Sequence, residues 1–110
     1  MEAIKGGEFI IRDTKANEIF IPEEWTEEQK MLADMCKDFI ATEIMPHLDR
    51  MDSMEEGFMP ALMEKAGELG LLSISIPEEL GGMGMDFKTS MLATEALGGS
   101  YSFSVAYGAH

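Results

Sequence analysis

The first half of the chain repeats apolar residues at three- and four-residue steps, the spacing of one face of an α-helix. The first such stripe consists of Leu32, Met35, Cys36, Phe39, Ile40 and Ile44. Thr26 and Gln29 stand just before it with the spacing of a capping box. We therefore predict a helix from Thr26 to about Met45, which Pro46 ends or kinks because proline has no amide hydrogen.

A second, shorter apolar face follows a polar connector at residues 47–57. It consists of Leu62, Met63, Ala66 and Leu69. Pro60 suits the first turn of this helix and Gly70 supplies its C-terminal stop. Beyond the stop, Leu71 is placed to fold back onto Ala66, so the chain leaves the helix in a defined direction.

Two further helical patterns occupy the last quarter of the chain. Asp86 is a suitable N-cap for a third helix that runs through Leu97. The two glycines at residues 98–99 end this helix. One side of this helix has Phe87, Met91, Thr94 and Leu97, and another has Leu92 and Ala96. Ser100 or Ser102 caps a fourth helix, of which the sequence contains scarcely two turns before it ends at His110. We expect an all-α bundle of about four helices that forms the front piece of a longer polypeptide.

Residues 76–84, Ile-Pro-Glu-Glu-Leu-Gly-Gly-Met-Gly, predict a rigid joint between the second and third helices. Three glycines within four positions permit left-handed or crowded backbone, and Pro77 fixes its own φ. A positive φ at Gly82 would make its replacement by valine costly. The loop has neither a dinucleotide fingerprint nor a lysine-terminated phosphate motif, and Glu78 and Glu79 stand beside it. We expect a tight turn and no anion site.

Residues 1–25 contain two short apolar runs, at residues 9–11 and 19–21, on either side of a polar stretch. The runs are compatible with a hairpin, but an isolated hairpin is marginal in water. An extended N-terminal arm that lies against helices or a neighbouring domain is therefore the favoured interpretation.

Length and charge limit the class of protein. A chain of 110 residues suffices for one domain with a modest core. Its 21 acidic and 8 basic residues, net charge −13, disfavour nucleic acid and anionic membranes as partners. It has no apolar stretch of the ~20 residues that span a bilayer, no secretory pattern and a lone cysteine, Cys36. We expect a cytoplasmic location and no transmembrane segment.

The last segment differs from the rest in charge. In residues 89–110, Glu95 is the only Asp, Glu, Lys or Arg, so we expect this segment to be covered by other protein. Glu95 is a candidate general base, although a structural helix carboxylate is the commoner role. The eleven methionines of the chain fill apolar gaps by default, or line surfaces that adapt to greasy ligands.

Other candidates for chemistry have weak signals. His47, Asp49 and Asp52 are close in sequence, but their spacing matches no strong metal-ligand motif, and a solvated helix end is the favoured interpretation. His110 lacks sequence context for a reactive role. Cys36 lies among apolar neighbours and is expected to be a small core residue. We predict no catalytic, cofactor-binding or metal-binding residue within the chain.

Several segments in order resemble acyl-CoA dehydrogenases, in particular their long-chain and very-long-chain branch. Residues 66–72 followed by residues 76–84 resemble the junction between the second and third helices of that family. Residues 6–9 and 20–29 are similar to its N-terminal segment, and residues 102–110 resemble its fourth helix. On this resemblance, residues 1–25 are an N-terminal arm and residues 26–110 are the family's N-terminal helical domain, truncated in the fourth helix.

The resemblance implies a full-length FAD-dependent enzyme that dehydrogenates fatty acyl-CoA thioesters in β-oxidation and passes electrons to an electron-transferring flavoprotein. The β-domain that holds most of the FAD and the C-terminal helical domain that supplies the catalytic glutamate lie outside these residues. The chain alone is therefore expected to be inactive, and the full enzyme to be a homo-oligomer. The family's fourth helix borders the acyl tunnel, which assigns its wall to Phe103, Ser104, Val105 and Tyr107.

Two alternatives belong to other classes. Asp52-Ser53-Met54 resembles the phosphopantetheine attachment site of acyl carrier proteins, where the serine opens a long helix. Here Gly57 and Pro60 follow too soon for an uninterrupted helix. The chain is also compatible with an independent docking module that uses its apolar last segment as a partner groove.

Overall fold

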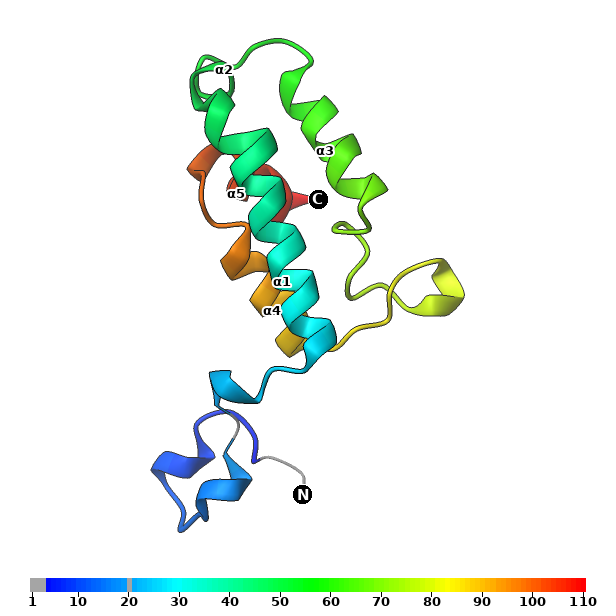
Figure 1. Cartoon of the computed structure of the whole chain (residues 1–110). Coiled ribbons are helices and arrows are strands. Elements are labelled where there is room, and N and C mark those ends of the chain that lie inside the picture. Colours follow the sequence, from blue (N-terminus) through cyan, green and yellow to red (C-terminus); the bar gives the residue numbers. More distant parts are fainter. Residues whose placement is uncertain (1–3, 20) are drawn as a thin grey trace.

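The computed structural model describes residues 4–19 and 21–110, and all of its regular elements are helical (Figure 1). The α-helices are α1 (Glu27–Phe39), α2 (Leu48–Asp52), α3 (Phe58–Glu68), α4 (Phe87–Ala96) and α5 (Tyr101–Ala109). No β-strand occurs in these two ranges, which confirms the all-α prediction. No helix in the described ranges is long and apolar enough to cross a membrane.

The first turns of α1 and α4 are joined by side-chain hydrogen bonds. The predicted capping box is present: the Thr26 hydroxyl accepts from the Gln29 amide at 3.2 Å, and the Gln29 side chain accepts from the Thr26 amide at 2.9 Å. The Gln29 side-chain amide donates to the Thr89 hydroxyl at 2.9 Å. That hydroxyl donates to the Asp86 carboxylate at 2.7 Å, and Asp86 caps α4 as predicted. Two local caps thereby set the position of α4 beside α1.

The end of the first helix differs from the prediction in its detail. The α-helix ends at Phe39 and widens into a π-helical turn at Ile40–Ile44, in which the Met45 amide donates to the Ile40 carbonyl. Pro46 explains the widening, because its ring would clash with the carbonyl four residues earlier in a regular helix. The chain then continues through a 3-10 turn at Met45–His47 into α2. The predicted connector at residues 47–57 is therefore partly helical.

Helix α3 ends as the sequence predicts. Gly70 has φ +80°, its amide donates to the Gly67 carbonyl, and the Leu71 amide donates to the Ala66 carbonyl, both at 2.9 Å. This bond pair is a Schellman motif, and it turns the Leu71 side chain into the core. Leu69 was predicted to be buried but is 43% exposed, because it lies at the helix end beyond the covering helices.

The core lies between α1, α3, α4 and α5. Its most completely buried side chains are Phe103, Ile44, Leu62, Leu71, Leu97 and Cys36. Helix α4 buries Thr89, Ala93 and Leu97, at four-residue steps, against α1. Of the two sides that the sequence left open, the one with Phe87 and Met91 is exposed. Two helices can approach closely only if the residues between them are small, and the larger side chains of α4 then point outward.

The glycine loop at residues 76–84 closes on its own backbone. The Met83 amide donates to the Ser73 carbonyl at 2.9 Å, and the Gly84 amide donates to the Ile76 carbonyl at 2.8 Å. Gly82 is required for a reason other than the one predicted: its φ is not positive, but a Cβ there would lie 2.1 Å from the Ile76 carbonyl oxygen. The loop is therefore a rigid joint, as expected.

The N-terminal arm, described here at residues 4–19 and 21–25, contains 3-10 turns and no paired strands. The turns are Glu8–Ile10, Ala16–Glu18 and Pro22–Glu24. One backbone bond, from the Ile4 amide to the Glu18 carbonyl at 2.9 Å, folds the arm back on itself. The hairpin alternative is not observed in these ranges, and Phe20 of its second apolar run lies outside them. The arm projects from the start of α1, away from the other helices (Figure 1).

We expect Gly82→Ala to destabilise the chain by about 1–3 kcal/mol, because the added methyl group displaces backbone that the loop needs. Gly67→Ala is the matched control: Gly67 lies within α3 and its Cβ would meet only the Leu72 side chain, at 3.4 Å. Alanine favours a helix interior, so this control should stabilise by about 0.5–1 kcal/mol. Urea unfolding monitored by circular dichroism measures both changes, and shifts of the same sign would contradict the close approach at Gly82.

Stability should also depend on the ionisation of Asp86. Hydrogen bonds from the Thr89 hydroxyl and amide hold the pKa of Asp86 below its ordinary value of 3.8. Its contribution to stability is therefore complete above that value and is lost as the pH falls through the lower pKa of the folded state. Asp86→Ala should cost about 0.5–2 kcal/mol at pH 7, and the difference from wild type should shrink below pH ~3. A gap in unfolding free energy that is constant from pH 7 to pH 2 would contradict this account.

Candidate functional site

A cleft of about 190 Å³ opens between α4, α5 and the segment that follows α3. We call it the α4–α5 cleft, and its lining includes Leu72, Ser75, Ser90, Thr94, Tyr107 and Gly108. Its lining holds no carboxylate, lysine or arginine. A cleft of this kind suits an apolar chain better than a charged group, because nothing in it compensates a buried charge.

Tyr107 fixes one wall of the α4–α5 cleft. Its side chain is buried, and its hydroxyl donates to the Leu71 carbonyl at 2.7 Å, which ties α5 to the segment after α3. Its ring stacks against Phe103, with centroids 6.1 Å apart. Burial, assisted by the nearby Cys36, raises the pKa of Tyr107. The phenol therefore stays neutral at physiological pH and serves as a structural hydrogen-bond donor.

His110 covers the end of the same cleft. Its ring packs against the Tyr107 ring with centroids 5.1 Å apart, and its Nε2 lies 3.2 Å from the Leu72 carbonyl oxygen. Its other ring nitrogen contacts the Tyr107 carbonyl oxygen. Both ring nitrogens of His110 thus face backbone carbonyls.

The four residues predicted for a tunnel wall have different surroundings. Phe103 is fully buried and packs against Phe39, with ring centroids 5.5 Å apart. Val105 is 55% exposed on the opposite side of α5. Ser104 is half-buried and donates to the Leu97 carbonyl at 3.4 Å. Of these four residues, only Tyr107 lines the α4–α5 cleft, where Gly108 is its neighbour. The role of the four residues in a substrate tunnel stays a prediction.

The sequence interpretation missed the polar residues that α4 contributes to this cleft. Ser90 and Thr94 lie one turn apart on α4, and the Thr94 hydroxyl donates to the Ser90 carbonyl at 2.9 Å. Two small hydroxyl residues four positions apart, on one face of a helix, were the available signal. The Thr94 side chain therefore satisfies its hydrogen-bonding capacity within its own helix while it lines the cavity.

The remaining sequence candidates do not form a reactive centre. Glu95 is exposed. His47 packs edge-on against Phe58, and Asp52 accepts from the Ser102 hydroxyl at 2.9 Å. Among the described residues, no three His, Cys, Asp or Glu side chains are grouped to hold a metal.

Cys36 and Ser53 also lack the surroundings that a reactive or modified residue needs. Cys36 is fully buried, and burial raises its pKa to about 11, so it is a core residue and a poor nucleophile. Ser53 follows the last turn of α2 and does not open a helix. This position removes the geometric basis of the carrier-protein alternative.

Comparison with known proteins assigns the fold to a class. Residues 26–110 match the family model described as acyl-CoA dehydrogenase, N-terminal domain. A crystal structure of an acyl-CoA dehydrogenase complexed with FAD from Bacillus anthracis covers 98% of the chain with a TM-score of 0.90 and 38% sequence identity. The chain therefore belongs to the acyl-CoA dehydrogenase family, of which it represents the N-terminal domain.

Individual relatives agree with this assignment. A probable acyl-CoA dehydrogenase of Bacillus subtilis (strain 168) is 42% identical over 106 residues, or 96% of this chain. The mitochondrial short-chain specific acyl-CoA dehydrogenase of Sus scrofa is 38% identical over 79 residues, or 72% of this chain. The chain spans only 18% and 19% of the lengths of these two relatives, and 18% of the Bacillus anthracis chain.

Tyr107→Phe should destabilise the chain by about 1–2 kcal/mol, because it leaves the buried Leu71 carbonyl without its donor. Tyr101→Phe is the matched control, since Tyr101 lies on the same helix and is 87% exposed. Urea unfolding of both variants measures the difference. Equal stabilities would show that the Tyr107 hydroxyl does not connect α5 to the segment after α3.

Proposed function

We propose that the chain is the N-terminal helical domain of a full-length, FAD-dependent acyl-CoA dehydrogenase, which oxidises fatty acyl-CoA thioesters between Cα and Cβ in β-oxidation. The match of residues 26–110 to the family's N-terminal domain supports the enzyme class. The α4–α5 cleft supports a fatty acyl substrate, because a lining without carboxylate, lysine or arginine favours an apolar chain. The long-chain branch of the family is part of the same proposal.

In this proposal, the domain contributes to the reaction by forming part of the wall around the substrate. In residues 89–110, Glu95 is the only charged residue, and it is exposed, so α4 and α5 present a surface suited to a hydrocarbon chain. We assign the cleft wall to Tyr107, with Phe103 supporting it from the core. Ser104 and Val105 lie outside the cleft, and their place in a tunnel wall is proposed from the resemblance of residues 102–110 to the family's fourth helix alone. A general base must come from a later part of the polypeptide.

Flavin chemistry also requires residues outside this domain. The glycine loop does not fit a diphosphate, because its amides are already used: Gly81 donates to Glu78, Gly82 to Pro77, and Gly84 to Ile76. The carboxylates of Glu78 and Glu79 would in addition repel an anion. Bound FAD supplies the electron acceptor of the reaction, and we place it on the later domains. The chain alone should therefore be inactive.

Further features of the full enzyme are included in the proposal. An electron-transferring flavoprotein accepts its electrons, the enzyme is a homo-oligomer, and its location is cytoplasmic. The support for these features is the membership of the chain in the acyl-CoA dehydrogenase family.

The test is to express the natural reading frame beyond His110 and to compare the product with the 110-residue chain. The full product should show flavin absorbance and reduce an electron-transferring flavoprotein when given a fatty acyl-CoA, while the short chain does neither. A reading frame that stops at residue 110, or a full product without flavin and activity, would overturn the proposal.

Within the full enzyme, Gly108→Phe should lower kcat/KM for long acyl chains relative to short ones by about tenfold or more, the discrimination typical of a blocked apolar pocket. No atom lies within 4 Å of a Cβ built on Gly108, so the ring can enter the cleft without a backbone clash. Ala109→Phe is the control, since Ala109 is its exposed neighbour on α5 outside the cleft lining. An unchanged ratio in Gly108→Phe would exclude the cleft from the substrate path.

A further inference from the structure

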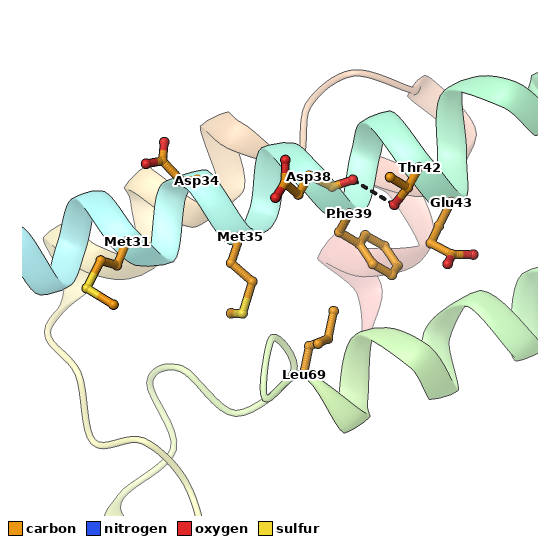
Figure 2. Close-up of a pocket in the computed structure, with 8 residues that line it drawn as sticks. All are labelled: Met31, Asp34, Met35, Asp38, Phe39, Thr42, Glu43 and Leu69. Atoms are coloured by element: carbon orange, nitrogen blue, oxygen red, sulfur yellow. Dashed lines mark hydrogen bonds between the residues drawn. The ribbon is translucent and has the colours of Figure 1, made fainter.

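The π-helical turn at the end of α1 is joined to the neighbouring helix α3. The turn spans Ile40–Ile44, and the Thr42 hydroxyl donates to the Asp38 carbonyl at 2.8 Å where the helix enters it (Figure 2). A threonine side chain that bonds back to its own helix favours a local bend. Glu43, also in the turn, pairs with Lys65 of α3 at 2.7 Å. The widened turn therefore lies beside α3.

The connection between α4 and α5 rests on the same turn through Gly99. A Cβ built on Gly99 would lie 2.8 Å from Cγ2 of Ile40 and 3.7 Å from Sδ of Met45. Ile40 is buried, and its Cγ2 belongs to a β-branched side chain with few rotamers, so this methyl group has little freedom to move aside. The φ of Gly99 is not positive, so lack of space alone requires glycine at this position.

The surface beneath Gly99 is a product of the π-helical turn. Ile40 and Met45, whose side chains flank Gly99, are the two residues that the hydrogen bond of the turn joins. In a regular α-helix the Ile40 carbonyl would accept from the amide of Ile44 instead. Pro46 favours the wider turn, and it therefore also shapes the surface on which the α4–α5 connection rests.

Helix α5 is held at both ends. In its first turn the Ser102 hydroxyl donates to the Asp52 carboxylate of α2 at 2.9 Å, and in its last turn the Tyr107 hydroxyl donates to the Leu71 carbonyl at 2.7 Å. Gly99 lies only two residues before this helix begins. A displacement of Gly99 would therefore tilt α5 about its fixed far end.

Such a tilt would change the shape of the α4–α5 cleft. Thr94 lines the cleft from the last turn of α4, and Tyr107 and Gly108 line it from the last turn of α5. In sequence, residues 97–100 join the two helices. The position of this short connection therefore affects the separation of the two walls.

We propose that Gly99 is a positioning residue for the α4–α5 cleft. By resting on the π-helical turn it sets the separation between Thr94 on α4 and Gly108 on α5, and thereby the fit of the cleft to the end of an acyl chain. Gly99 does not line the cleft itself. The effect on an acyl chain rests on the proposed function, whereas the effect on the cleft walls does not.

Amide resonances of the 110-residue chain, measured by two-dimensional NMR, test the effect on the walls. Gly99→Ala should shift the resonances of Thr94 and Gly108, because the added methyl group pushes the connection away from Ile40. Ile40→Leu removes the branched methyl group and keeps the size of the side chain. In the double variant, both resonances should return to their positions in Ile40→Leu alone.

Gly57→Ala is the matched control. Gly57 has φ +79°, and no atom lies within 4 Å of a Cβ built on it, so alanine there strains the backbone at the start of α3 without pushing on a neighbour. It should lower the midpoint of urea unfolding and leave the resonances of Thr94 and Gly108 in place. Unchanged resonances in Gly99→Ala, or no recovery with Ile40→Leu, would overturn the proposal.

In the full enzyme, Gly99→Ala should lower the ratio of kcat/KM for long acyl chains to that for short ones by about threefold or more, because in the proposed function only a long chain reaches the cleft. Adding Ile40→Leu should restore the ratio, and Gly57→Ala should leave it unchanged. An active enzyme whose ratio does not respond to Gly99→Ala would overturn the proposal while the proposed function stands. A full product without activity would overturn the proposed function and with it the effect on acyl selectivity, and the amide resonances would then decide whether Gly99 positions the walls.

Discussion

The hydrogen-bonded connection between the first turns of α1 and α4 is the constraint on which the rest of this domain depends. Thr26 and Gln29 cap α1, Asp86 and Thr89 cap α4, and the hydrogen bond from the Gln29 side chain to the Thr89 hydroxyl joins the two caps. Since each member is satisfied, the connection stabilises one relative position of α1 and α4. Small side chains then allow α4 to pack closely on α1, and α5 follows from the end of α4.

Two short loops, the turn after α3 and the glycine loop, connect the packed helices and shape the α4–α5 cleft. The Schellman turn after α3 directs Leu71 into the core and presents its carbonyl to the Tyr107 hydroxyl. The rigid glycine loop then returns the chain to the start of α4. Because both loops are closed by backbone hydrogen bonds, the α4–α5 cleft has walls that are defined before any ligand arrives. A preformed cleft without charged groups is suited to a hydrocarbon chain, which supplies no polar contacts to order it.

Charge is unevenly distributed over the surface of the domain. The α4–α5 side is nearly free of charge, which agrees with a surface that later parts of an acyl-CoA dehydrogenase cover.

Local sequence by itself determined the helix caps at Thr26 and Asp86, the glycine stop at residue 70 and the apolar stripe of α1, because each depends on residues within a few positions of one another. For α5 it left Ser100 and Ser102 open, and the structure has Ser100 as the cap. The family resemblance was equally local, since it rested on ordered motifs. Tertiary structure alone decided which face of α4 is buried, that Leu69 is exposed, and that Gly82 is needed for close approach to Ile76. It also brought Ser90, Thr94 and Gly108 to one cleft. Periodicity gives a helix an apolar side but not its neighbours, and burial and cavities depend on which surfaces come together in space.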